Sequence, residues 1–206
     1  LISVSCIMKT EPPIARTENI QDTLHGVVVS DPYRWLENWN DPAVQEWSDR
    51  QNVYARNYLD QLPHRQEIEK RISQIYRQLS VSYYDLRWSN GKLFAMKNQP
   101  DLNQPMLVYL TLAADPGSEQ IILDLNTLDS THSTSIDWYQ PSPDGNLVAV
   151  SLSIGGSESG DLHIYETATG HQVFEVIPTV NKGTAGGDIA WVADGKGFYY
   201  TRYPHP

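Results

Sequence analysis

Serine residues in the stretch GGSESG, residues 155–160, come closest to a nucleophile in this sequence. A hydrolytic serine commonly occupies the centre of G-x-S-x-G, a strained turn between a strand and a helix that exposes the hydroxyl beside a histidine. Here the glycines are misplaced, and the stretch lies between two segments with strand character. Ser157 and Ser159 are therefore interpreted as turn residues, and G-x-S-x-G occurs nowhere in the 206 residues.

Two histidines have an aspartate close by in the sequence. Asp161 and His163 share one strand face at i, i+2, which could orient an imidazole or contribute two metal ligands, but no third ligand has suitable spacing. His132 follows Asp129 and Ser130 in LDSTHSTS, where crowding of Ser and Thr is typical of a polar loop. The other histidines stand alone in loops or on polar helix edges: His25, His64, His171 and His205. We assign no residue as catalytic, cofactor-binding or metal-binding.

The composition excludes several classes of partner. A formal net charge of −10 and the lack of any Lys/Arg cluster argue against a nucleic-acid surface. Gly186-Gly187 precede a strand-like segment rather than a helix, so they predict no phosphate loop. Cys6 is the only cysteine, and no run approaches the ~18 apolar residues of a membrane span. We expect no cofactor, no nucleic acid and no membrane partner, and a cytoplasmic location.

The elements that would position any site begin with two predicted helices within residues 41–78. Asp41 can cap the first helix, with Pro42 in its first turn, and Pro63 marks the break before the second. Each helix has an apolar stripe with helical spacing. The first stripe holds Val44, Trp47, Tyr54, Tyr58 and Leu62, and the second holds Ile68, Ile72 and Ile75.

Beyond Ser80 the pattern is that of strands and tight turns. Asn90-Gly91 lies between two strand-like runs and is the strongest short hairpin signal, because both residues tolerate positive φ. Further strand-like runs begin at Met106, Gln120, Asn146, Asp161 and Gly197, each bounded by Gly, Pro, Asn or Asp.

The strand-rich part contains a repeat. IDWYQPSPDGNLVAV begins at Ile136, IAWVADGKGFYY begins at Ile189, and a weaker copy, LRWSNGKLFAM, begins at Leu86. Their turn glycines, Gly91, Gly145 and Gly195, are spaced by 54 and 50 residues. Four short strands in a repeat of this length predict a β-propeller, with tandem hairpins of a β-sandwich as the alternative.

The number of blades is too small for a closed ring. Propellers have about 4 to 8 blades, whereas residues 80–206 hold two blades and the start of a third. We therefore expect a truncated α+β chain, in which an N-terminal segment with two helices precedes the first two to three blades of a propeller. The seven residues before Met8 are a possible upstream extension.

The stretch DPYRWLENWNDPAVQEWSDRQNVYARNYLDQLPHRQEIEKRISQIY, residues 31–76, resembles the N-terminal region of the prolyl oligopeptidase family of serine peptidases. The similarity continues through SPDG, GSESGDLHIYETATG and IAWVADGKGFYYTRYP. The resemblance implies an α/β-hydrolase domain on which the N-terminal segment packs and a seven-bladed propeller inserted after that segment. It also implies that the serine, aspartate and histidine of the catalytic triad all lie beyond residue 206.

On this reading, residues 1–79 form a clasp on a catalytic domain encoded downstream, and residues 80–206 form a partial propeller truncated in the third blade. Tyr33, Trp35, Leu36 and Trp47 would supply apolar area to the clasp. The alternative is a small helical domain with its own core.

Two classes of function remain. The first is the N-terminal part of a serine oligopeptidase that cuts short peptides, with the propeller restricting substrate size and the chain alone inactive. The second is a non-enzymatic propeller that binds another protein. Prolyl-specific members of the family place an aromatic residue near the substrate pocket shortly before the third blade's Ala-Trp, where this chain has TAGGDIAW. Cleavage after proline and a relaxed or altered specificity within the same family therefore both stay open.

Overall fold

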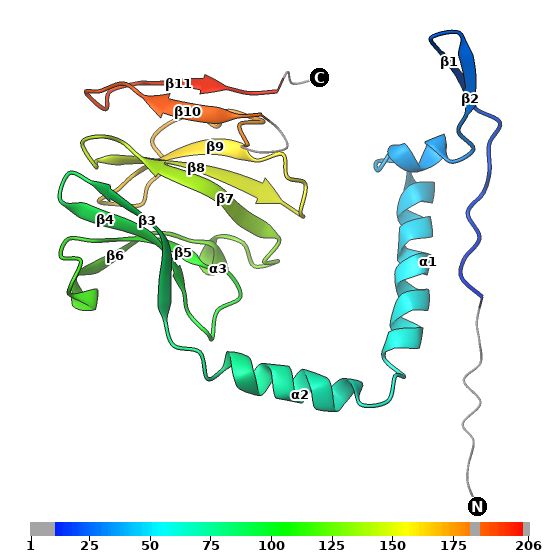
Figure 1. The fold of residues 1–206 in the computed structure, drawn as a ribbon, viewed down its shortest axis with the longest axis horizontal. Helices are drawn as coiled ribbons and strands as arrows, with labels where there is room; N and C mark the ends of the chain where they lie inside the picture. The colour runs from blue at the N-terminus through cyan, green and yellow to red at the C-terminus, as the bar shows by residue number, and fades with distance from the viewer. Residues whose placement is uncertain (1–10, 182–185, 204–206) are drawn as a thin grey trace, which may run out of the picture. The chain divides into compact units, whose positions relative to one another are not determined.

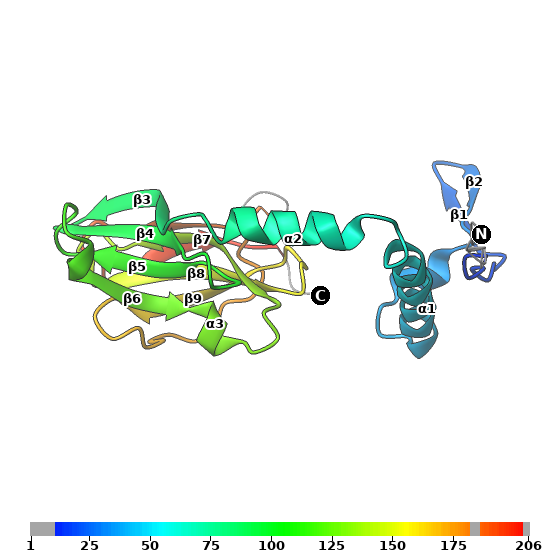
Figure 2. The same cartoon turned by 90° about the horizontal axis from the view of Figure 1, so that it is seen from below.

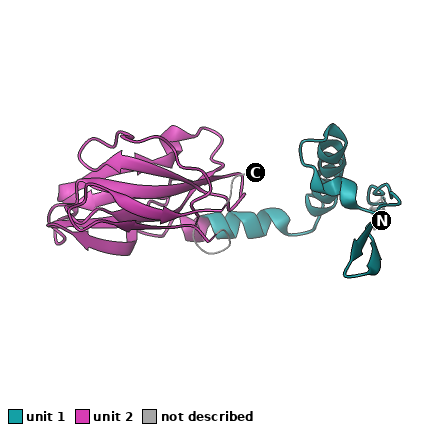
Figure 3. Ribbon diagram, turned by 90° about the horizontal axis from the view of Figure 1, so that it is seen from above, with its two compact units in different colours: residues 1–73 teal, residues 74–206 magenta. Residues whose placement is uncertain are grey.

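The structure is a computed structural model that describes residues 11–181 and 186–203. The chain divides into two compact units, Leu1–Ser73 and Gln74–Pro206, coloured separately in Figure 3. The division falls inside the second helix, and each unit is described by itself.

The first unit opens with a two-stranded antiparallel hairpin, β1 (Gln21–Leu24) and β2 (Val27–Ser30). His25 and Gly26 form its turn with φ of 51° and 83°. A short 3-10 helix, η1 (Arg34–Glu37), and helix α1 (Pro42–Leu59) follow. All four residues of β2 are exposed, so this hairpin shows apolar valine side chains to solvent.

The two predicted helices are confirmed. Helix α1 begins where expected, because the Asp41 carboxylate accepts a hydrogen bond of 2.9 Å from the Ala43 N–H and Pro42 occupies the first turn. Helix α2 (Arg65–Tyr76) begins shortly after Pro63. The apolar stripes remain largely uncovered, since α1 buries only Val44 and α2 buries no residue.

The aromatic stretch forms a small core within the first unit. Trp35 is 9% exposed and packs edge-on against Trp47, with ring centroids 6.2 Å apart. The Arg16 guanidinium lies 4.4 Å from the Trp35 ring, and the indole N–H donates to the Arg16 carbonyl at 2.9 Å. Most of the Trp35 surface is therefore used inside its own unit, whereas Tyr33 is 47% exposed.

The second unit begins with a four-stranded antiparallel sheet in the order β3-β4-β5-β6 (Figure 1). Its strands are β3 (Ser82–Ser89), β4 (Lys92–Asn98), β5 (Met106–Leu110) and β6 (Glu119–Asp124). Asn90 and Gly91 have φ of 43° and 79°, as the hairpin prediction requires. The short helices η2 (Pro116–Ser118) and α3 (Leu125–Leu128) flank β6. This sheet is the first blade.

The second blade contains β7 (Thr134–Pro141), β8 (Leu147–Ile154) and β9 (Asp161–Glu166). Residues 172–177 complete it as an irregular fourth strand, through the bridges Leu162–Ile177 and Tyr165–Gln172. A third hairpin, β10 (Asp188–Trp191) and β11 (Phe198–Thr201), starts the next blade. The sheets of the two blades and the third hairpin follow one another in layers (Figure 1). Figure 2 gives the view from below, with the first blade in front of the second.

Each sheet packs its face against the next. Side chains of the first and second blades form one buried cluster that includes Phe94, Leu107, Tyr139 and Val148, all fully buried. A second cluster joins the second blade to the third hairpin through Trp138, Ile164 and Ile189, among others. Strands β3 and β7 are in contact, so the first strands of the first and second blades lie close together. In a propeller that position is beside the central channel.

Candidate functional site

The two candidate serines lie in the connection between β8 and β9. Gly155 and Gly156 have φ of 62° and 71°, and the Ser159 N–H donates to the Ser157 hydroxyl at 3.4 Å. Both serines are exposed. Within the described residues neither hydroxyl contacts an imidazole, so the geometry is that of a turn, not of an activated nucleophile.

Asp161 and His163 do not act on one another. The Asp161 carboxylate accepts a hydrogen bond of 3.0 Å from the Thr179 N–H. The His163 Nδ1 lies 2.9 Å from the Gln172 side-chain oxygen, and its ring stacks on Tyr165 with centroids 6.1 Å apart. Each residue therefore ties β9 to a different neighbouring segment.

Asp129 organises the polar loop that contains His132. Its carboxylate accepts hydrogen bonds from the Thr131 hydroxyl at 2.6 Å and from the Thr134 hydroxyl and N–H, both at 2.8 Å. These hydrogen bonds, that of Thr131 first, hold the pKa of Asp129 well below its usual range. The role of Asp129 is to fold the loop that leads into β7.

This geometry predicts an acid-resistant carboxylate. Because the pKa of Asp129 is lower in the folded state than its ordinary value of 3.8, its ionised carboxylate stabilises the fold at pH values above 3.8. This stabilisation is lost only as the pH falls through the folded-state pKa. Carboxyl ¹³C NMR should therefore show Asp129 still ionised at pH values where ordinary aspartates are protonated. Asp129→Asn removes the signal and serves as its assignment control. A titration midpoint near 3.8 would contradict the prediction.

The remaining histidines have no neighbouring nucleophile among the residues described. His64 lies at an exposed position with its Nδ1 2.9 Å from a Glu67 carboxylate oxygen. His25 and His171 are exposed, and His205 lies outside the described residues. In residues 11–181 and 186–203, no three His, Cys, Asp or Glu side chains come together as a metal site requires, and no helix there is long and apolar enough to cross a membrane.

The first strands of the three blades converge on a concave surface, which we call the inner-strand surface. A cavity of about 470 Å³ is lined by residues 87–89 of β3, by residues 140, 141 and 143 around the end of β7, and by residues 189–191 of β10. The three segments are the repeat copies found in the sequence. Equivalent positions of successive blades therefore build one shared surface.

Arg87 supplies the positive charge of this surface. The Arg87 Nε lies 3.3 Å from an Asp85 carboxylate oxygen. The central guanidinium carbon, Cζ, lies 5.0 Å from the centre of the Tyr139 ring. The Tyr139 hydroxyl donates to the Asp85 carbonyl across the two blades. Burial of the ring, with Asp85 nearby, raises the pKa of Tyr139, so the hydroxyl stays a proton donor at neutral pH.

Side chains at the turn between β3 and β4 donate hydrogen bonds to the turn between β7 and β8. The Ser89 hydroxyl donates to the Ser142 carbonyl at 2.6 Å, and the Asn90 amide donates to the Asp144 carbonyl at 2.7 Å. The Lys92 ammonium donates to the Gly145 carbonyl at 2.7 Å. The third hairpin is linked through the Trp191 indole N–H, which donates to the Gln140 carbonyl at 3.1 Å. These contacts hold the three segments of the inner-strand surface together.

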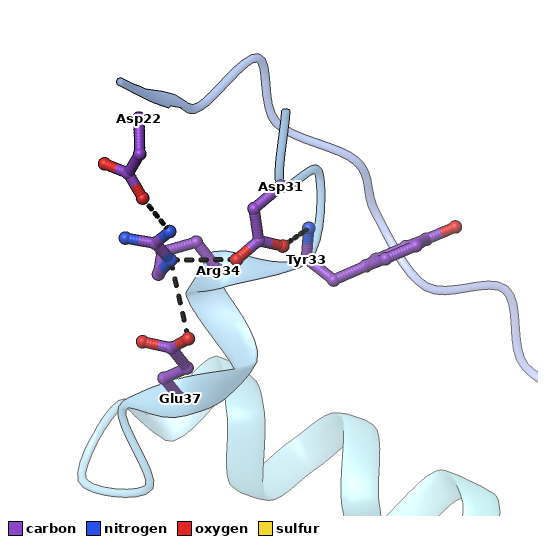
Figure 4. Close-up of polar contacts among 5 residues, drawn as sticks. All are labelled: Asp22, Asp31, Tyr33, Arg34 and Glu37. Carbon is purple, nitrogen blue, oxygen red and sulfur yellow. Dashed lines mark hydrogen bonds and ion pairs between the residues drawn. The ribbon is translucent and has the colours of Figure 1, made fainter. Parts of the chain in front are cut away.

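A separate charged cluster lies in the first unit, around Arg34 (Figure 4). Its guanidinium pairs with Asp22 of β1, with Asp31 at 2.8 Å and with Glu37 at 3.4 Å. Hydrogen bonds to Asp22 and then Asp31 raise the pKa of Arg34, and Arg34 lowers the pKa of Asp31. The cluster ties the β1–β2 hairpin to η1, so its role is structural.

The stacked sheets and their shared inner-strand surface define part of a β-propeller. Comparison with known proteins identifies its family. Residues 12–206 match the family model described as the prolyl oligopeptidase N-terminal β-propeller domain. The chain belongs to the prolyl oligopeptidase family of serine peptidases.

Curated relatives agree with this assignment. Prolyl endopeptidase of Elizabethkingia meningoseptica is 30% identical over 185 residues, which cover 90% of this chain and 25% of that protein. Prolyl oligopeptidase A of Galerina marginata is 29% identical and is covered over 28% of its length. The chain thus spans about a quarter of the length of the relatives it matches.

Solved structures show the same fold. A structure from a study of two prolyl endopeptidases, concerned with inter-domain dynamics in catalysis and specificity, is 30% identical with a TM-score of 0.75, over 95% of this chain and 28% of that one. Prolyl oligopeptidase B from Galerina marginata, bound to a 35mer substrate, is 23% identical with a TM-score of 0.69, over 94% of this chain and 30% of that one, which shows the fold alone.

Sequence reasoning missed both charged arrangements. The DPYRW stretch was recognised for its aromatic residues, yet Arg34 joins it to Asp22 twelve residues earlier. An aspartate early in each inner strand, Asp85, Asp137 and Asp188, was a signal available in the repeat itself. Asp137 accepts hydrogen bonds of 2.8 Å from both Ser151 and Ser153, so this aspartate ties β7 to β8.

Proposed function

We propose that this chain is the N-terminal part of a serine oligopeptidase that hydrolyses short peptides by acyl-enzyme chemistry. The observation that carries the proposal is the family match over residues 12–206, which covers about a quarter of each related prolyl endopeptidase. The catalytic triad would come from an α/β-hydrolase domain in the remainder of the longer parent protein, with no cofactor and no catalytic residue from these 206 positions. The propeller of the parent would have seven blades, and the protein would be cytoplasmic.

We assign residues 1–79 as the segment that packs on the catalytic domain, and residues 80–206 as the start of the propeller. Support comes from apolar surface that the described residues leave uncovered along α2 and on the β1–β2 hairpin. Ile68, Ile72 and Ile75 of α2 are 57%, 49% and 46% exposed, and Val28 of β2 is 61% exposed. A helix with an exposed apolar stripe ordinarily buries it against another element.

The chain alone is expected to hydrolyse no peptide. Without G-x-S-x-G, and with Ser157 and Ser159 in an exposed turn, it offers no activated nucleophile. The test is incubation with a fluorogenic Gly-Pro substrate and with a fluorophosphonate probe of active-site serines, with a prolyl endopeptidase as positive control. Turnover of the substrate or covalent labelling of the chain by the probe would contradict the prediction. If the signal persisted in the Ser157→Ala, Ser159→Ala double variant, a different serine would be responsible.

The propeller is expected to restrict the parent enzyme to short peptides. A ring of blades stacked over a hydrolase pocket leaves a narrow approach, which an unfolded peptide can pass and a folded protein cannot. The measurement compares cleavage of one short peptide with cleavage of the same sequence in a rigid loop of a folded protein. The control substrate is a folded protein that carries the same sequence in a flexible loop. Equal cleavage rates for the peptide, the rigid loop and the flexible loop would refute the size restriction.

Specificity of the parent need not be confined to proline. Shortly before Ala190-Trp191, the region in which the family resemblance implies an aromatic residue for prolyl-specific members, Gly186 has φ of 62°. A Cβ added there would lie 3.7 Å from the Tyr203 ring. A Cβ on Gly187 would lie 2.6 Å from backbone atoms of Val180 and Asn181, so no side chain fits there. We propose a relaxed preference at the residue before the scissile bond, to be tested with a series of substrates that vary this residue.

A further inference from the structure

The turn between β3 and β4 contains a chemically labile pair of residues. Asn90-Gly91 is the only Asn-Gly pair in the sequence, and both residues are exposed in the structure. Asparagine is a thermolabile residue, and a following glycine has no Cβ to hinder attack by its own backbone nitrogen on the side-chain amide. The pair that forms the hairpin is therefore also a candidate site of covalent modification.

Deamidation at this pair requires only the chain and water. The Gly91 nitrogen gives up its proton to solvent and bonds to Cγ of Asn90, while the bond from Cγ to Nδ2 breaks. Ammonia leaves and a succinimide ring remains. Water then adds to a ring carbonyl carbon and breaks its bond to the ring nitrogen, which gives aspartate by attack at Cγ or isoaspartate by attack at the backbone carbon. The net change is water consumed and ammonia released.

The structure restrains both reacting groups. Asn90 and Gly91 have φ of 43° and 79°, the conformation of a tight hairpin turn. Pairing of Ser89 with Lys92 closes this turn. The Asn90 amide is held by the second blade, because it donates to the Asp144 carbonyl at 2.7 Å. The side chain must leave this partner, and the turn must open, before the Gly91 nitrogen reaches Cγ.

The residues on either side of the labile pair also contact the second blade. The Ser89 hydroxyl donates to the Ser142 carbonyl at 2.6 Å. The Lys92 ammonium donates to the Gly145 carbonyl at 2.7 Å. Asn90 is therefore released only when the turn of the first blade separates locally from the turn of the second. All of these contacts lie between the two blades that the structure describes.

We propose that Asn90 is a site of spontaneous deamidation, that the contact between the first two blades sets its rate, and that its products loosen this contact. Aspartate at position 90 places a carboxylate oxygen where an amide N–H met the Asp144 carbonyl, so a hydrogen bond becomes a pair of facing acceptors. Isoaspartate adds a main-chain atom to the turn, which disturbs the register of Ser89 with Lys92. The contact therefore weakens as the molecule ages, whether or not the parent protein is a peptidase.

The first experiment measures the deamidation rate in the 206-residue chain. Trypsin releases residues 88–92, WSNGK, in which mass spectrometry detects the replacement of the side-chain NH2 by OH. A synthetic peptide of residues 86–94, LRWSNGKLF, is digested in the same way and gives the unrestrained rate. Asn90 should react in the chain, but about threefold or more slowly than in the peptide, because a hydrogen bond must first break. No reaction in the chain, or a rate equal to that of the peptide, would overturn the proposal.

Gly145→Ala tests whether the second blade sets the rate. Gly145 has φ of 67°, and an added Cβ would lie 3.1 Å from the Ser89 carbonyl oxygen and 3.5 Å from the Asn90 Cβ. The turn of the first blade must move away, so deamidation should accelerate about threefold or more, toward the rate of the peptide. Gly155→Ala is the matched control, because Gly155 has φ of 62° at the other end of β8 and its added Cβ meets nothing within 4 Å.

Equal deamidation rates in the two glycine variants would refute control by the blade contact. Ser89→Ala provides a second test that adds no atom to the turn and keeps Asn90-Gly91 intact. It removes the hydrogen bonds that the Ser89 hydroxyl donates to the second blade, so it should also accelerate the reaction. In concentrated urea the rates of all variants should converge on that of the peptide, and differences that persist there would have a cause other than the fold.

The effect of the product is measured on Asn90→Asp, because aspartate is accepted in this turn and the variant isolates the loss of the amide donor. Amides in the turn between β7 and β8 should exchange hydrogen about threefold or more faster than in the unmodified chain. Asn98→Asp is the matched control, since Asn98 is exposed at the far end of the same hairpin and the substitution adds the same charge. Equal exchange in the two variants would contradict the loosening of the blades.

Discussion

Replacing Gly170 by alanine is expected to destabilise the second blade by about 2 to 5 kcal/mol. Gly170 has φ of 68°, and left-handed backbone costs a residue with a Cβ about 1 to 2 kcal/mol. An added Cβ would also lie 2.5 Å from the Ile122 carbonyl oxygen of the first blade. That atom belongs to the β6 backbone and cannot rotate away, so the two blades must separate at a further cost of about 1 to 3 kcal/mol.

Gly155→Ala is the matched control for this substitution. Gly155 has a nearly identical φ of 62°, but its added Cβ meets nothing within 4 Å. It should therefore show the left-handed backbone cost alone. The difference between the two variants isolates the contact between blades.

Hydrogen exchange measured by mass spectrometry is suited to this comparison, because it reports local opening even when a protein is only partly ordered. Amides of β9 and β6 should exchange about thirtyfold faster or more in Gly170→Ala, since 1.4 kcal/mol corresponds to a factor of ten. The Gly155→Ala protein should show a much smaller change. Equal acceleration in the two variants would mean that the close approach to Ile122 has no energetic consequence.

The blade repeat was predictable because its signals are local. Asn90-Gly91 and the Asp-Gly turns at Gly145 and Gly195 specify hairpins by backbone conformation alone, and the structure has a hairpin at each of the three. The start of α1 was equally accessible, because Asp41 and Pro42 act within one turn of the helix. Interactions of this range require no knowledge of the tertiary fold.

Burial could not be predicted in the same way, because it depends on segments distant in the sequence. Trp35 and Tyr33 are two residues apart and both aromatic, yet only Trp35 meets Trp47 and the backbone of Arg16. The helical stripe of Ile68, Ile72 and Ile75 has the pattern of a buried face and remains exposed. A periodic pattern identifies which face is apolar; it does not identify what covers that face.

In the candidate site, too, local features were predictable from the sequence and contacts between distant segments were not. The interpretation of Ser157 and Ser159 as turn residues followed from their loop context, and the structure has both in the connection between β8 and β9. The inner-strand surface was out of reach, because Arg87, Gln140 and Trp191 are about fifty residues apart and meet only through blade stacking. Their contacts are largely with backbone carbonyls, which carry no sequence signature.

Expressed alone, the 206-residue chain is expected to aggregate or to remain partly ordered. The described residues expose many large apolar side chains, among them Trp88 at 64%, Leu86 at 58% and Val28 at 61%. Burial of each such side chain is worth about 1.5 to 3 kcal/mol, so several unburied ones together equal the net stability of about 5 to 15 kcal/mol of an ordinary domain. Unpaired strand edges add a route to association.

Size-exclusion chromatography with light scattering and a thermal unfolding scan test this expectation. The chain should elute as heterogeneous oligomers and unfold over a broad range of temperature. A soluble monomer with one sharp cooperative transition would contradict it, because a self-sufficient core would then have to exist within these residues.

The order that remains should be concentrated between the first two blades. Phe94, Leu107, Tyr139, Val148 and Val150 are fully buried there, and the hairpin turns are joined by hydrogen bonds from Ser89, Asn90 and Lys92. Exchange protection should therefore be highest in β4, β5 and β8 and lowest in α2 and β11, whose apolar faces are uncovered. Uniform protection across the chain would show that the exposed stripes cost little. Protection confined to the helices would show that blade stacking needs more of the ring than two blades.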